Sequence, residues 1–136
     1  MFRFEFVVDV PPVSQQARRR ERVRQWIDKV RSMAAQSWPS GEVPFSDSIQ
    51  VSITWFYEAI SISMDVDNIP KPIIDGLKGL VFIDDNQVTD MICRKRNQNE
   101  ELQIRNPSPI LAEGLSRKKD VLYIVVEDAP DQRVIL

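Results

Sequence analysis

Two acidic clusters are the residues of this sequence best suited to chemistry. The first, MDVDN, contains Asp65 and Asp67, and the second, FIDDNQV, contains Asp84 and Asp85. Carboxylates held close together repel one another, and they ionise fully only when a divalent cation neutralises them. Oxygen ligands favour hard cations such as Mg²⁺, Mn²⁺ or Ca²⁺. The two clusters therefore predict a carboxylate metal site.

The composition narrows the chemistry further. The 136 residues include no histidine and one cysteine. Histidine is the usual general base near neutral pH and the commonest transition-metal ligand, so its absence excludes Ser-His-Asp hydrolases and histidine-based nucleases. Histidine-containing zinc sites are excluded for the same reason, and with a single cysteine a thiolate zinc site is excluded as well. Metal-assisted hydrolysis of a phosphodiester remains possible, because carboxylates alone can hold the ion that polarises the phosphate and activates a water.

The segment between the two clusters is expected to bring them together. It predicts a helix from Asp67 to Leu80, with Pro70 and Pro72 in its first turn. A helix of about a dozen residues, at about 1.5 Å per residue, and a short return would place Asp84 or Asp85 beside the first cluster. Lys71, one turn beyond Asp67, can share that face and stabilise charge on a phosphate.

A purely structural interpretation remains open for each cluster. Asp and Asn at the start of a helix or in a turn before a strand are also the residues that capping and Asx turns require. A calcium-binding EF-hand is excluded, because Pro70 stands where that loop needs glycine and Gly76 where it needs glutamate.

Hydrophobic periodicity indicates the elements that must position these residues. Alternating apolar residues predict strands at about 2–10, 48–57 and 88–96, and a continuous apolar run predicts a well-buried strand at 121–127. Helical spacing predicts helices from an N-cap at Ser14 to about Gln36, over 67–80, and over 110–119. The order β-α-β-α-β-(α)-β predicts an α+β fold: one domain over 1–136, with helices packed on a mixed sheet of about four strands and a tail past about residue 129.

Positive charge is concentrated in short runs, although the net charge is −2. Three separated basic runs, which begin at Arg18, Arg94 and Arg117, could line one DNA-sized surface. For the first run a solvated helix face is an equal alternative. The residues expected to contact DNA belong to the first two runs: Arg18, Arg19, Arg20, Arg94, Lys95 and Arg96.

The two clusters and the helix between them resemble a known signature. DVDNIPKPIIDGLKGLVFIDDNQV, residues 65–88, is similar to the pattern DxDNxxKxxxDxLxGxxxxDDxQV of the RusA family of crossover-junction endodeoxyribonucleases. The segment DVPPVS, near the N-terminus, also resembles that family. Every fixed position of the signature is met: Asp65, Asp67, Asn68, Lys71, Asp75, Leu77, Gly79, Asp84, Asp85, Gln87 and Val88.

The resemblance implies a homodimer that binds four-way DNA junctions and, with Mg²⁺, makes paired nicks that resolve them in recombination and repair. Asp65, Asp67 and Asp85 would be the essential carboxylates and metal ligands, Lys71 the catalytic cation, and Asp84 a further acid at the metal.

Two more positions of the signature are expected to support the site without binding the metal directly. These are Asn68 and Asp75, and Asp75 is expected to pair with Lys71 four residues earlier in the helix.

Other functions remain open beside junction resolution. The chain could be a nuclease for other branched DNA, or a non-catalytic branched-DNA-binding or scaffold protein of the same fold. Mn²⁺ is expected to substitute for Mg²⁺, and no small-molecule cofactor is expected. The apolar runs are shorter than the roughly 20 residues that span a bilayer, and there is one cysteine and no evident secretory signal. A cytoplasmic protein without a membrane segment is therefore expected.

Overall fold

The computed structural model describes residues 2–58 and 64–135. Its elements follow the expected order, with two 3₁₀ turns, η1 and η2, that the sequence did not predict as such. In chain order they are β1 (Arg3–Val8), α1 (Arg20–Ser37), β2 (Ile49–Tyr57), η1 (Val66–Asn68), α2 (Pro70–Leu77), η2 (Asp85–Gln87), β3 (Val88–Asn97), α3 (Pro109–Ser116) and β4 (Val121–Asp128).

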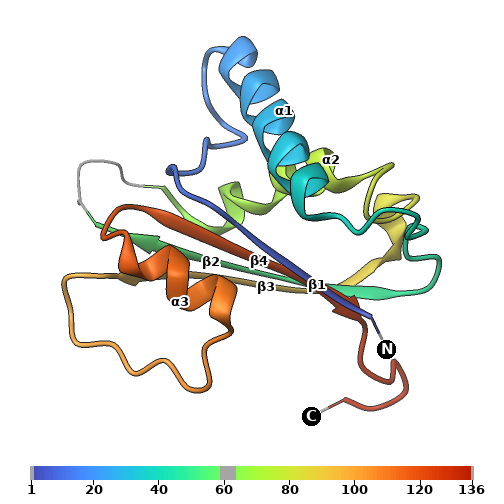
Figure 1. Cartoon of the computed structure of the whole chain (residues 1–136). Coiled ribbons are helices and arrows are strands. Elements are labelled where there is room, and N and C mark those ends of the chain that lie inside the picture. The colour runs from blue at the N-terminus through green and yellow to red at the C-terminus, as the bar shows by residue number, and fades with distance from the viewer. Residues whose placement is uncertain (1, 59–63, 136) are drawn as a thin grey trace.

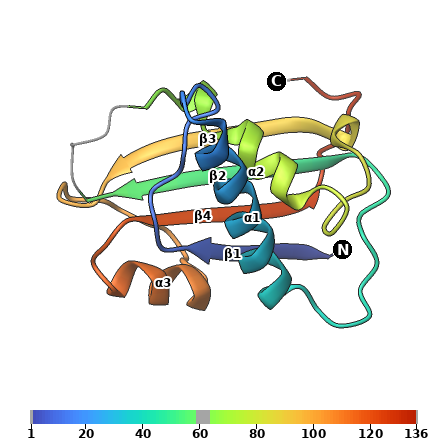
Figure 2. The ribbon, with the colours of Figure 1, turned by 90° about the horizontal axis from the view of Figure 1, so that it is seen from above.

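The strands of the described residues form one mixed sheet in the order β1-β4-β2-β3. β2 and β3 run parallel, whereas β4 pairs antiparallel with both β1 and β2. Helices α1 and α2 cover one face of the sheet and α3 lies on the other (Figures 1 and 2). The expected α+β fold with a four-stranded mixed sheet is confirmed.

Position in the sheet decides how deeply each strand is buried. The central strands β2 and β4 bury side chains on both faces, and Ile53 and Ile124 have no exposed surface. In β1 the expected alternation is confirmed, because Phe4, Phe6 and Val8 are buried and the residues between them are not. Strand β3 lies at an edge, and none of its residues is fully buried. Side chains on both faces of β3 are therefore accessible to a ligand.

The first helix begins later than the sequence predicted. Ser14 is not its N-cap: the Ser14 hydroxyl accepts a hydrogen bond from the Gln16 N–H (3.0 Å), within a separate turn. The N-cap of α1 is Arg19, whose side chain makes no capping hydrogen bond. The buried stripe of α1 starts only at Val23, so there is no apolar face before it to hold a longer helix against the sheet. Of the predicted arginine run, Arg18 consequently precedes the helix.

The second helix is shorter than the predicted 67–80. Its first turn is a separate 3₁₀ turn, η1, and the α-helix runs from Pro70 to Leu77 with both prolines near its start, as expected. Gly79 has a φ of 87°, a left-handed conformation that favours glycine, and its N–H donates to the carbonyl of Phe82 (2.7 Å). This turn ends the helix and reverses the chain toward Asp84.

Helix α2 is held close to α1 by a small residue. A Cβ added at Gly76 would lie 3.0 Å from the Ile27 carbonyl oxygen and 3.0 Å from Val30 Cγ1. Ile73 and Leu77 on the same helix have no exposed surface and belong to the main core. The tight α1–α2 contact therefore fixes the helix that joins the two acidic clusters.

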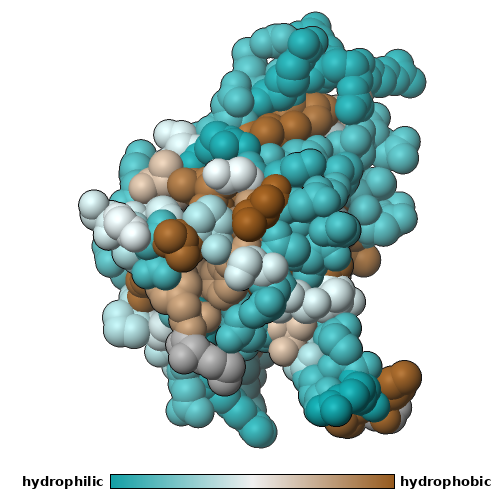
Figure 3. Space-filling view, turned by 90° about the vertical axis from the view of Figure 1, so that its right-hand side faces the viewer, coloured by the Kyte–Doolittle hydropathy of each residue, from teal (hydrophilic) through white to brown (hydrophobic). Residues whose placement is uncertain are grey.

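The segment past residue 129 has no regular element among its described residues, as the predicted tail requires. Val134 and Ile135 are 66% and 92% exposed, and Figure 3 shows the tail standing apart from the body with hydrophobic surface at its end. Within the described part of the chain, no helix is both long and apolar enough to cross a membrane.

Candidate functional site

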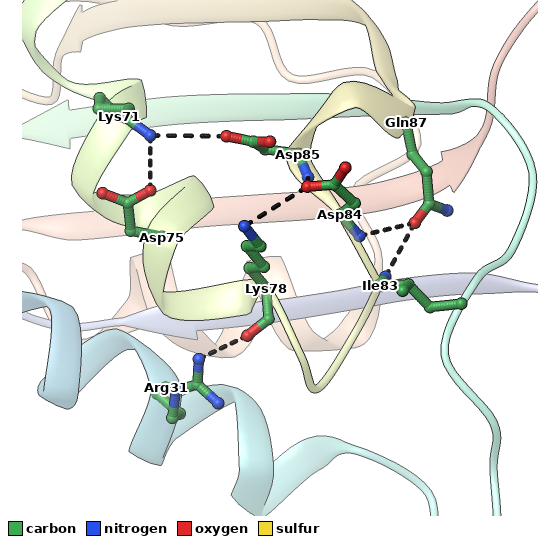
Figure 4. A network of polar contacts seen from close by, with 8 residues as sticks. All are labelled: Arg31, Lys71, Asp75, Lys78, Ile83, Asp84, Asp85 and Gln87. Carbon is green, nitrogen blue, oxygen red and sulfur yellow. Dashed lines mark hydrogen bonds and ion pairs between the residues drawn. The ribbon is translucent and has the colours of Figure 1, made fainter.

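The two acidic clusters lie at either side of α2. Turn η1, with Asp67, leads directly into the helix, and η2, with Asp85, follows the turn that leaves it. Strand β3 starts directly after η2 and contacts η1. Turns η1 and η2 thus both border α2, and Figure 4 shows Asp85 of the second cluster beside Lys71 of that helix.

Lys71 connects α2 to the second cluster. Its Nζ lies 2.7 Å from Asp75 Oδ1, the pairing expected from the sequence, and 3.7 Å from Asp85 Oδ2. The hydrogen bond to Asp75 raises the pKa of Lys71, and the charge of Asp85 adds to this, while partial burial opposes it. Lys71 is therefore a cation at neutral pH, suited to stabilising negative charge and not to acting as a base.

Asp84 has a structural role that fits the capping interpretation. Its Oδ1 accepts a hydrogen bond from the Asp85 N–H at 2.9 Å, as the N-cap of η2, and lies 3.4 Å from Lys78 Nζ. The side-chain interaction with Asp85 is the main cause of a lowered pKa of Asp84, and Lys78 and the Asp85 N–H contribute in the same direction. This carboxylate is thus partly committed to holding the turn.

Gln87 holds the same turn through all of its side-chain polar groups. Its Oε1 accepts from the Ile83 and Asp84 N–H groups, both at 2.9 Å (Figure 4). Its Nε2 donates to the carbonyl oxygens of Phe45 (2.8 Å) and Asp47 (2.9 Å). Gln87 therefore ties the Asp84-Asp85 turn to the segment that precedes β2.

The carboxylates of the first cluster have no comparable structural task. Asp65 stands at the N-cap position of η1 but makes no side-chain capping bond. Asp65 and Asp67 are exposed, and neither side chain forms a hydrogen bond or ion pair with another described residue. Their backbone is held instead, because Lys95 Nζ donates to the Met64 carbonyl (2.8 Å) and the Asn68 N–H donates to the Asp65 carbonyl (3.0 Å). Capping therefore does not account for Asp65.

The donor set fits a hard cation, although a complete metal cage is not preassembled. Asp65, Asp67 and Asp85 offer exposed carboxylate oxygens, the ligands that Mg²⁺ and Mn²⁺ prefer. Within the described ranges, no three acidic or cysteine side chains already lie in a metal-holding arrangement. The metal site remains a prediction.

The first basic run lies next to the first acidic cluster. Arg20 Nη1 donates to the Gln15 carbonyl (2.7 Å), and the Gln15 N–H donates to the carbonyl of Asn68 (3.1 Å), the last residue of η1. Arg18 and Arg19, like Arg20, are exposed. This contact between segments far apart in the sequence was not predictable from the sequence.

The second basic run is divided between the two faces of the sheet. Lys95 points toward the acidic site, where it binds the Met64 carbonyl. Arg94 and Arg96 point to the α3 face and line a groove there. Arg94 and Arg96 therefore lie on the opposite face of the sheet from Lys95, because successive side chains of a strand alternate between faces, and the prediction that this run contacts DNA stays a prediction.

Sequence reasoning missed the roles of three residues: Lys78, Gln87 and Lys95. For Gln87 a signal was present, since Asp84-Asp85-Asn86-Gln87 follows the capping-box pattern of an N-cap residue and a Gln three positions later. No comparable local signal exists for Lys78 or Lys95, because their partners, Asp84 and Met64, come from other segments.

An α+β domain that gathers acidic and basic side chains beside one helix has the groups needed for chemistry on a charged substrate. The family model described as endodeoxyribonuclease RusA matches residues 9–105, well over half of the chain. The chain belongs to the RusA family. A search of curated proteins gives no match.

Family membership indicates an endodeoxyribonuclease, a hydrolase of the kind that resolves Holliday junctions and acts on branched DNA. The matched residues contain both acidic clusters but not β4, the strand that joins β1 to β2 in the sheet. The match therefore covers the site, while the chain beyond it completes the sheet.

Proposed function

We propose that this protein is a divalent-metal-dependent endodeoxyribonuclease that resolves four-way DNA junctions by paired nicks. The observation that carries the proposal is the position of Lys71. Its ammonium group joins Asp75 on α2 to Asp85 on η2, so that the helix and the second acidic cluster of the family signature contribute to one charged site. Such a site suits phosphodiester hydrolysis, in which negative charge develops at the phosphate.

Asp65, Asp67 and Asp85 are proposed to hold Mg²⁺ or Mn²⁺, with Asp84 as a further acid beside them. When bound, the ion would polarise the scissile phosphate and lower the pKa of an attacking water. Lys71, held in position by its hydrogen bond to Asp75, would stabilise the negative charge of the phosphate.

Two further groups are proposed to orient these residues. Asp75 holds the Lys71 ammonium group, and Asn68 holds the turn that carries Asp67, since its carbonyl accepts from the Gln15 N–H. The second contact also places the arginine-rich segment at the start of α1 beside the site. Arg18, Arg19 and Arg20 are therefore proposed to bind phosphates near the cleaved bond.

Paired nicks need two active sites, one for each of two opposed strands. A homodimer is accordingly proposed as the active form. Sedimentation of the protein alone and bound to a junction would measure its stoichiometry, and one protomer on a junction that is nicked in both strands would contradict this part of the proposal.

The central test compares cleavage of a labelled four-way junction with cleavage of linear duplex of the same sequence, with and without Mg²⁺. Asp67→Asn removes a ligand charge with little change of shape, so it should abolish cleavage and leave DNA binding intact. Asp28→Asn is a matched control, because it makes the same charge change on the exposed surface of α1. It should cleave as the wild type does.

The alternatives predict different outcomes of the same assay. Equal cutting of linear duplex would contradict junction selectivity and favour a nuclease with broader DNA substrates. Tight binding without cleavage in either Mg²⁺ or Mn²⁺ would favour a branched-DNA-binding protein that has kept the fold. Full activity of Asp67→Asn would overturn the metal assignment.

A further inference from the structure

A second charged site lies on the face of the sheet that the acidic residues do not use. It is a groove of about 600 Å³ between β3, α3 and the segment that joins them. We call it the arginine groove. The residues that matter to the argument are Thr54, Arg94, Arg96, Gln103, Arg105 and Tyr123.

The floor of the groove is set by the register of the sheet. Thr54 pairs with Arg94 on one side and with Tyr123 on the other, so the three side chains form a row across β3, β2 and β4. Arg96 stands two residues further along the edge strand, about 6.7 Å away at the rise of a β-strand. This spacing is comparable to that of successive phosphates in a nucleic acid strand.

The walls of the groove are apolar and rigidly attached. Leu102 and Ile104, from the segment before α3, pack against a small core of Phe56, Leu111 and Val121. The N-terminus of α3 is capped by Ser108, whose hydroxyl accepts from the Leu111 N–H (3.2 Å). The segment that carries Gln103 and Arg105 is therefore held in place by Leu102 and Ile104, and it leads into a capped helix.

The groove carries the positive charge of three arginines, and the described residues of its lining include no acidic one. Arg94, Arg96 and Arg105 are exposed, and none of them forms an ion pair with a carboxylate in the described part of the chain. Arg96 donates only to the Lys95 carbonyl (2.9 Å). A carboxylate contact of the lining is made by Tyr123, whose hydroxyl donates to Glu5 (3.0 Å).

We propose that the arginine groove binds the phosphodiester backbone of one arm of the branched DNA, as a second DNA site separate from the cleavage site. Guanidinium groups bind phosphate oxygens through paired hydrogen bonds, and an array of three suits a polyanion better than a single small anion. The four arms of a junction point in several directions, so they can reach both faces of the protein. The identity of the DNA rests on the proposed function.

The first test measures the salt dependence of junction binding without divalent metal, so that no cleavage is needed. Each phosphate contact contributes about 0.9 to the slope of log K against log salt concentration. Arg94→Gln with Arg105→Gln should therefore reduce the slope by about 1.8. Lys29→Gln with Arg133→Gln removes the same charge at exposed positions away from the groove and should reduce it by much less.

A second test locates the DNA directly. Gln103→Cys places an exposed thiol in the groove, and bound junction should slow its alkylation about tenfold or more. Ser40→Cys, in the exposed loop after α1, is the control and should be alkylated equally fast with and without DNA. The native Cys93 gives little background, because burial raises the pKa of its thiol to about 11.

Three outcomes would overturn the proposal. One is an unchanged salt slope in the arginine variant, and another is unchanged alkylation of Gln103→Cys on a saturated junction. The third is protection by a nucleoside triphosphate or by concentrated protein without DNA, which would assign the groove to a small phosphate ligand or to a second copy. Failure of the proposed nuclease function would appear separately, as absence of cleavage with both DNA-binding results intact.

Discussion

Replacement of Gln87 tests whether the second acidic cluster is positioned by the contacts seen here. Gln87→Ala removes four hydrogen bonds, of which those to the Asp84 N–H and the Phe45 carbonyl are part-buried and the other two are exposed. Water can replace the two exposed hydrogen bonds, so most of the loss in stability comes from the two part-buried ones, at about 1 kcal/mol each. The free energy of unfolding should fall by about 2 kcal/mol, which corresponds to a melting temperature lower by roughly 6 °C.

Gln87→Glu separates the two halves of this network. It keeps the oxygen that accepts from Ile83 and Asp84, but it places a second oxygen against the carbonyls of Phe45 and Asp47. Because those carbonyls disfavour the ionised carboxylate, the pKa of the introduced carboxyl group should be higher in the folded state than in the unfolded state. The variant should be less stable than Gln87→Ala at pH 7 and should recover relative to it as the pH falls toward about 4.

The assay is urea unfolding of both variants between pH 4 and 7, with Gln25→Ala on the exposed face of α1 as control. Cleavage at saturating DNA should also fall, on the order of a hundredfold, because a misplaced Asp85 turn disturbs the site geometry. A Gln87→Ala protein within about 0.5 kcal/mol of wild type, below the expected hydrogen-bond contribution, would refute the reasoning.

Three other predictions follow from single contacts. Gly76→Ala should lower the free energy of unfolding by about 1–3 kcal/mol in urea titrations, because its Cβ would press on the Ile27 carbonyl and Val30. Lys71 should remain charged well above neutral pH. Asp75→Asn removes the main cause of its raised pKa, so the pKa of Lys71 measured by NMR should be lower in that variant. Cys93 should react slowly with thiol reagents at about pH 7.5, since burial raises the pKa of its thiol to about 11, and it should react quickly after unfolding. Fast labelling of the folded protein would contradict its burial.

Local sequence patterns were sufficient to predict most of the helices and strands and the kinds of residue in the site. Alternating apolar residues predicted the positions of β1, β2 and β3, because such a strand places successive side chains on opposite faces, and the continuous apolar run at 121–127 predicted β4. The i, i+4 spacing within α2 predicted the pairing of Lys71 with Asp75, which the structure confirms. The start of the first helix was predicted too early, at Ser14 instead of Arg19, because Ser14 has the chemistry of a cap but uses it in a separate turn.

The sequence by itself determined the acidic signature, the mixed α+β class and the exclusion of histidine chemistry and of histidine or thiolate zinc sites, since residue types and short-range spacing decide these. Only the tertiary structure decided that β4 lies between β1 and β2, that Lys71 reaches Asp85, and that Lys95 and not Arg94 shares the face of the acidic residues. Strand order and contacts between segments far apart in the sequence depend on which of those segments bury each other's surfaces best. That choice is made by the packing of the whole chain and leaves no mark on the local spacing of its residues.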